Sequence, residues 1–177
     1  VGCGKATDDI TNNPLVAEWN TPFQTPPFSQ IEMKHYEPAI DYAIEQNRAE
    51  IDAIINNPEA PTFENTIVAM EQAGELLGRV SGVFFVPNGS CTSDEMQQIA
   101  LNITPKLTEL SNDISLNPEL FARVKAVYET TDKGSLSTEQ QRLLQKSYDS
   151  FARSGANLNE EDKAKYRELT TELGQAT

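Results

Sequence analysis

Apolar side chains recur at helical spacing through most of the chain after residue 34. The clearest stripe has successive members three or four residues apart: Met96, Ile99, Ile103, Leu107, Leu110 and Ile114. This spacing places the whole stripe on one face of an amphipathic helix that is about five turns long. Pro105 lies within the stripe, so we expect a kink at this position rather than a break.

Turn and capping residues divide this helical part into six helices, which we expect to start near residues 36, 62, 93, 118, 137 and 159. The side-chain oxygens of Ser, Thr and Asn can accept hydrogen bonds from the free backbone N–H groups at helix starts. The expected caps are Thr62, Thr92 with Glu95, Asn117 before Pro118, Ser137 with Gln140, and Asn159. Because no β-alternation of useful length occurs, the sequence predicts an all-α fold of six antiparallel helices without a sheet.

The second expected helix contains Gly74 and Gly78, and we expect these glycines to allow another helix to approach closely. It is followed by Val86-Pro87-Asn88-Gly89, which is a turn signal.

Residues 14–33 have a different pattern, rich in prolines and aromatic residues: Pro14, Trp19, Pro22, Phe23, Pro26, Pro27 and Phe28. The prolines exclude a regular helix or a central strand. We expect an extended arm that buries its aromatic side chains on the helical body. The alternative is a polyproline ligand for a partner protein. Residues 1–13 are polar and are interpreted as a flexible leader, so residues 14–177 form the helical domain.

The net charge limits the classes of molecule that the chain is expected to bind. The 177-residue chain has a net charge of −13. An excess of acidic groups repels phosphates, which argues against nucleic acid and anionic lipid surfaces as partners. The chain is 38% apolar, which is enough to form a core, and no stretch approaches the length of a membrane span.

The amino terminus offers one candidate site residue, Cys3. The chain opens with Val1-Gly2-Cys3 rather than with Met, so we expect that it has been processed or trimmed. These residues resemble the end of a bacterial lipobox, which predicts Cys3 as a lipid anchor and the bacterial cell envelope as the location. The alternatives are an unmodified cysteine on a cytoplasmic protein and, less favoured, a disulfide with Cys91.

Histidine content limits the chemistry of the chain, because His35 is its only histidine. A zinc-peptidase motif of the His-Glu-x-x-His type needs two histidines, so we expect no metal ligands and no catalytic residues here. We interpret His35 as a capping or packing residue at the start of the first helix. Gly74 and Gly78 do not form a phosphate loop, since Lys-Ser/Thr does not follow them.

Several short runs, taken in order, resemble the amino-terminal helical region of thimet-oligopeptidase-like zinc metallopeptidases, in the bacterial peptidyl-dipeptidase and oligopeptidase A branch. The most specific run is Asn57-Pro58-Glu59-Ala60-Pro61-Thr62-Phe63-Glu64-Asn65-Thr66-Ile67. The others include Trp19-Asn20-Thr21-Pro22-Phe23, His35-Tyr36-x-Pro38-Ala39-Ile40, Leu116-Asn117-Pro118-x-Leu120-Phe121 and Ser154-Gly155-Ala156-Asn157-Leu158. The resemblance covers residues 13–177, and residues 86–89 depart from the Asn-rich loop that the family leads us to expect.

The resemblance implies a parent enzyme that hydrolyses short peptides in a channel, with one zinc ion held by a carboxy-terminal catalytic half. This chain would then form part of the channel wall, and its partners would be that catalytic half and short peptide substrates. The last helix has no stop signal before Thr177, so we expect the zinc helix to lie beyond it. An isolated piece of this kind is expected to expose apolar surface, and to dimerise or to be partly open.

Two other interpretations remain open from the sequence. One is a stand-alone helical lipoprotein that binds a partner protein. The other is a structural helical bundle without a ligand.

Overall fold

The computed structural model describes residues 9–85, 93–155 and 158–176. Its α-helices are α1 (Tyr36–Ile55), α2 (Ala69–Ala73), α3 (Glu75–Phe85), α4 (Asp94–Ser115), α5 (Pro118–Thr130), α6 (Thr138–Arg153) and α7 (Glu160–Ala176). No strand occurs within these described ranges. The all-α class is therefore confirmed, and α2 and α3 together occupy the place of the second expected helix.

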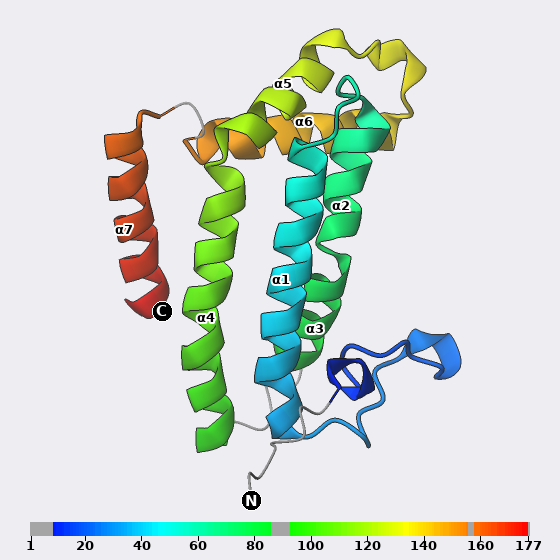
Figure 1. Cartoon of the computed structure of the whole chain (residues 1–177), viewed down its shortest axis with the longest axis vertical. Coiled ribbons are helices and arrows are strands. Elements are labelled where there is room, and N and C mark those ends of the chain that lie inside the picture. The colour runs from blue at the N-terminus through cyan, green and yellow to red at the C-terminus, as the bar shows by residue number, and fades with distance from the viewer. Residues whose placement is uncertain (1–8, 86–92, 156–157, 177) are drawn as a thin grey trace, which may run out of the picture.

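The helices α1, α3, α4 and α7 stand side by side, and α5 and α6 cross one end of this group (Figure 1). α3 returns antiparallel to α1, α4 packs on α1, and α7 returns antiparallel to α4. This arrangement leaves α7 in contact with α4 at the edge of the molecule, while α1 contacts both α3 and α4.

The second expected helix is less regular than its sequence pattern predicts. It begins with a π-helical turn (Phe63–Val68), continues as α2, and is interrupted at Gly74 before α3. Thr62 caps the turn as expected, since its hydroxyl accepts from the Asn65 backbone N–H at 3.0 Å. The expectation of a close helix contact at Gly74 and Gly78 is wrong, because no atom lies within 4 Å of a Cβ added at either glycine.

The other expected caps can be compared with the structure one by one. The side chains of Asn117, Ser137 and Asn159 each accept from backbone N–H groups in the first turn of their helices, as predicted. For α4 the prediction was one residue early: Ser93 is the cap, and its hydroxyl accepts from Met96 N–H at 3.2 Å. Thr92 and the turn at residues 86–89 lie outside the described residues. α4 continues through Pro105 without a break.

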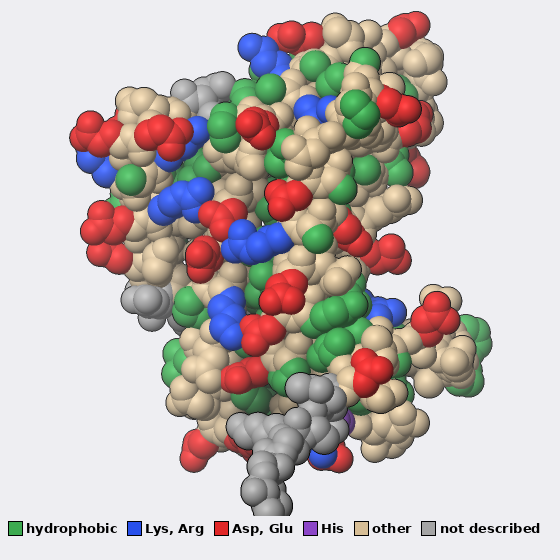
Figure 2. Space-filling view, in the orientation of Figure 1, with side chains coloured by type: hydrophobic (Ala, Val, Ile, Leu, Met, Phe, Trp, Pro, Cys, Tyr) green, Lys and Arg blue, Asp and Glu red, His purple; other side chains and the backbone are tan. Residues whose placement is uncertain are grey.

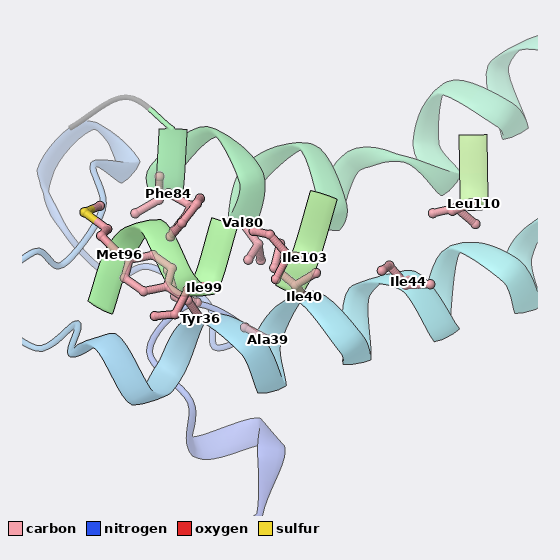
Figure 3. Packing of buried hydrophobic residues seen from close by; sticks show 12 residues of the cluster. Tyr36, Ala39, Ile40, Ile44, Val80, Phe84, Met96, Ile99, Ile103 and Leu110 are labelled. Carbon is pink, nitrogen blue, oxygen red and sulfur yellow. The ribbon is translucent and has the colours of Figure 1, made fainter. Parts of the chain in front are cut away.

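The hydrophobic core consists of two clusters that follow one another along α1. The first lies between α1, α3 and α4, and Figure 3 shows Tyr36 and Ile40 of α1 close to Phe84 of α3 and Ile103 of α4. The rings of Tyr36 and Phe84 meet edge to face with their centroids 5.0 Å apart. The second cluster joins the far end of α1 to the π-helical turn, α5 and α6: Ile51, Ile54, Phe63, Ile67, Leu120, Phe121, Val124, Val127, Leu144 and Phe151.

The amino-terminal arm is only partly packed on this body. Trp19 contacts the first cluster, donates to the Pro14 carbonyl at 2.9 Å and lies 4.9 Å from the guanidinium of Arg79. Phe23, by contrast, is 97% exposed, and Phe28 is also exposed. The prediction that the aromatic residues of the arm are buried is therefore wrong for both phenylalanines.

The reason lies in the backbone at the tip of the arm. Phe23 and Gln24 both have positive φ angles, and the resulting tight turn points the Phe23 ring away from the body. Residues 10–12, at the end of the expected leader, form a short 3-10 turn.

Candidate interaction surface

Of the residues that the sequence analysis singled out for chemistry, His35 lies in the part of the chain that the structure describes. No group of three or more His, Cys, Asp or Glu side chains able to hold a metal ion occurs in the part of the chain that the structure describes. Cys3 and Cys91 lie outside that part, so neither the lipid anchor nor the disulfide is tested.

His35 has the capping role that we expected. Its Nδ1 atom accepts from the Glu32 backbone N–H at 2.9 Å and completes a capping box around residues 33–35. Its carbonyl accepts from the side-chain amide of Asn13 at 2.9 Å, which ties the amino-terminal segment to the start of α1. These contacts are structural, because they join His35 to the backbone of Glu32 and to the side chain of Asn13.

A charged cluster joins α1, α4 and α7. Asp113 of α4 accepts from Arg48 of α1 at 2.6 Å and from Arg167 of α7 at 2.5 Å. Figure 2 shows acidic and basic side chains interleaved over the face that these helices form. Partial burial raises the pKa of Asp113, but the hydrogen bonds and positive charges of Arg48 and Arg167 outweigh it, so the pKa lies below its ordinary value of 3.8.

A pocket of about 420 Å³ lies beside this cluster, between the start of α5 and the start of α7. Lys163 lines it, with a side chain that is only 8% exposed and an ammonium group 3.2 Å from the carboxylate of Glu160. Glu160 itself is almost fully exposed. The pocket therefore combines a buried ammonium group with an exposed carboxylate as its counter-ion. We interpret this ion pair as part of the packing of α7 against the body rather than as catalytic.

α7 rests on α4 through polar and small residues. The Asn112 amide donates to the Thr170 hydroxyl at 2.8 Å, and a Cβ added at Gly174 would lie 3.5 Å from the Thr108 hydroxyl. α7 does not bury its two leucines, because Leu169 is 64% exposed and Leu173 is similarly exposed. α7 therefore turns much of its apolar surface outward.

Exposed apolar side chains also occur on other elements. Among the described residues, the large ones are Phe23, Phe28, Leu101, Leu158, Leu169 and Leu173. Single exposed apolar side chains are common on protein surfaces, and these six are distributed over the arm, α4, the segment before α7 and α7 itself. No local sequence pattern identifies this set, because exposure depends on which neighbouring elements are present.

None of the described helices combines the length and the apolar character that crossing a membrane requires.

Comparison of the sequence with known proteins identifies relatives of this chain. No family model matches the chain. The chain is 45% identical to dipeptidyl carboxypeptidase of Escherichia coli over 94% of its length, and 44% identical to the Salmonella typhimurium protein of the same name over 92%. It is 26% identical to oligopeptidase A of Escherichia coli over 92% of its length. The chain spans about a quarter of the length of these relatives (24%, 24% and 23%). It is homologous to the amino-terminal region of dipeptidyl carboxypeptidase and oligopeptidase A, of the thimet oligopeptidase family.

Proposed function

We propose that this chain is the amino-terminal helical region of a zinc-dependent oligopeptidase or peptidyl-dipeptidase that hydrolyses short peptides. The observation that carries this proposal is the 45% identity to dipeptidyl carboxypeptidase over 94% of the chain. Because the match covers 94% of the chain, it includes helices and the loops between them, which supports a common role and not only a common helix pattern. The proposal concerns the longer protein, since the chain spans 24% of that relative.

The zinc ion belongs to another part of that protein in this proposal. The residues of the described ranges do not fit a zinc site, because they form no cluster of three potential ligands and His35 is occupied as a cap. This region would therefore contribute binding and exclusion rather than bond-making.

The role proposed for the region is that of a channel wall which limits entry to short, unfolded peptides. Two features support it. The two core clusters on α1 hold the helices in a rigid layer. The exposed apolar side chains on α4, α7 and the arm are suited to contact with the remainder of the enzyme.

Peptide hydrolysis by two purified proteins tests the proposal. The longer protein encoded by the gene is compared with residues 1–177 alone, each incubated with a bradykinin-like peptide. We expect cleavage by the longer protein, loss of cleavage with a chelator and recovery with zinc, and no cleavage by residues 1–177. Chelator-sensitive cleavage by residues 1–177, or an inactive longer protein that is folded and zinc-loaded, would contradict the proposal.

We also propose that Cys3 anchors the protein to the cell envelope, on the basis of the Val1-Gly2-Cys3 motif. Metabolic labelling with a radioactive fatty acid in a bacterial host tests this. Label in the wild-type precursor and none in Cys3→Ser is the expected result, and equal labelling of both would contradict it.

A further inference from the structure

α7 covers only part of α4. In Figure 1, α7 runs antiparallel to α4 and ends partway along it, while α4 continues toward its own start with no helix on that side. The contacts between them set the register: Arg167 pairs with Asp113, Thr170 with Asn112, and Gly174 lies against Thr108. Each step toward the end of α7 is thus a step toward the start of α4.

The uncovered part of α4 carries an apolar side chain on the same face. Leu101 precedes Thr108 by seven residues and Asn112 by eleven, spacings that return to one side of a helix. Leu101 is 67% exposed and Pro105, between them on this face, is also exposed. Ile103, which points the other way, is fully buried in the first core cluster.

The register shows what would lie opposite Leu101. Both helices rise by the same distance per residue, so the partner of Leu101 is roughly seven residues after Gly174, which is about four residues after Thr177. The face of α4 that α7 covers therefore extends further than α7 does, and its uncovered part carries Leu101 and Pro105 where its covered part carries Thr108 and Asn112.

We propose that α7 continues past Thr177 in the longer protein for about two turns, and that this continuation buries Leu101 and Pro105. The inference rests on the proposed function, because it requires the longer polypeptide of which this chain would be about a quarter. It assigns an apolar side chain to a position about four residues after Thr177, facing Leu101. The α4–α7 pair then becomes a continuous structural edge that connects this region to the rest of the enzyme.

Cysteine accessibility tests the covering of Leu101. Leu101→Cys is introduced into residues 1–177 and into the longer protein, both with Cys3→Ser and Cys91→Ser. Maleimide labelling is timed under native conditions, and circular dichroism confirms that the variants fold. We expect labelling about tenfold slower in the longer protein, since burial requires local opening before reaction. Glu109→Cys, on an exposed position of the same helix, is the matched control and should change by less than about twofold.

A second measurement identifies the occupant. In the longer protein, a cysteine placed at the fourth residue after Thr177 should form a disulfide with Leu101→Cys under mild oxidation. A cysteine two residues later points to the opposite side of the helix and should not. Protection of Leu101→Cys without this cross-link would mean that another segment covers it, and the proposal would be wrong.

Two further outcomes separate the alternatives. If labelling of Leu101→Cys in the longer protein is slow at high protein concentration and rapid on dilution, a second copy covers Leu101, which contradicts the proposal. Peptidase activity of the longer protein is measured in parallel: an active enzyme whose Leu101→Cys labels rapidly refutes the helix continuation alone, whereas protection in an inactive protein refutes only the proposed function.

Discussion

Asp113 links three helices that are distant in sequence, and replacing it with asparagine tests how α7 is held. Its two carboxylate oxygens accept from Arg48 and Arg167 at 2.6 and 2.5 Å. Asp113→Asn keeps the shape of the side chain but removes the charge, and its amide group places a donor opposite an arginine donor. At least one of the two charged hydrogen bonds is then lost. The other is accepted by an uncharged amide oxygen in place of a carboxylate oxygen.

The size of the effect follows from burial. A hydrogen bond to a charged group contributes about 1.5–3 kcal/mol when well buried. The side chains of Arg48, Asp113 and Arg167 are 40%, 31% and 41% exposed, so solvent screening reduces each bond to about 1 kcal/mol. We therefore expect Asp113→Asn to lower the free energy of unfolding by about 2 kcal/mol, or the urea midpoint by about 1 M.

The pH dependence of this effect has a definite sign. The pKa of Asp113 is lower in the folded protein than its ordinary value of 3.8, so the carboxylate stabilises the fold fully above that value. This stabilisation is lost as the pH falls below 3.8 through the lowered pKa. The difference in stability between wild type and Asp113→Asn should therefore be constant near neutral pH and shrink in acid.

Urea unfolding followed by circular dichroism measures the free energies, and hydrogen exchange locates the change. Exchange in α7 should accelerate most, because Arg167 anchors that helix to α4. Glu109→Gln is the control, since Glu109 is exposed on the same helix. A loss below about 0.5 kcal/mol, the usual range of surface substitutions, would refute the reasoning, as would a loss that is unchanged in acid.

Substitutions at four further positions test local features by the same unfolding assay. Asn117→Ala should cost about 1 kcal/mol, since the Asn117 side chain accepts from two backbone N–H groups at 3.0 and 3.1 Å; Asn117→Asp should restore most of it. Gly78→Ala should add about 0.5–1 kcal/mol, because a Cβ there meets open space in a helix, whereas Gly155→Ala should destabilise, because φ is +83° and Leu158 lies 2.5 Å from the added Cβ. Gln24→Asn should add about 0.5 kcal/mol by suiting the positive φ of 52°, and an unchanged midpoint would argue against strain at this turn.

Helix starts could be predicted from the sequence because capping is a local interaction. Asn117, Ser137 and Asn159 bond to N–H groups two or three residues away, and these pairs are visible in the sequence. The faces that form the core could also be predicted. Apolar residues at helical spacing lie on one face of the helix, and that face is buried, as at Ile99 and Ile103.

The features that the sequence analysis did not predict depend mostly on contacts between distant parts of the chain. Asp113 lies 65 residues from Arg48 and 54 from Arg167, so no spacing pattern identifies the cluster. Phe23 and Leu169 have the composition of buried residues, yet no neighbouring element in the structure covers them. The interruption at Gly74 and the π-helical turn before it likewise have no distinctive sequence pattern, because α and π turns use the same residues.

The position of α1 in both core clusters has a mechanical consequence. Ile40 and Ile44 belong to the first cluster, whereas Ile51 and Ile54 belong to the second, so one helix of about 30 Å is clamped at both ends. A close-packed interior is barely compressible, and α1 has no proline or glycine between the clamps at which to bend. We therefore expect force applied to α5 and α6 at one end to be transmitted along α1 toward the amino-terminal arm at the other, with little bending of α1 in the middle.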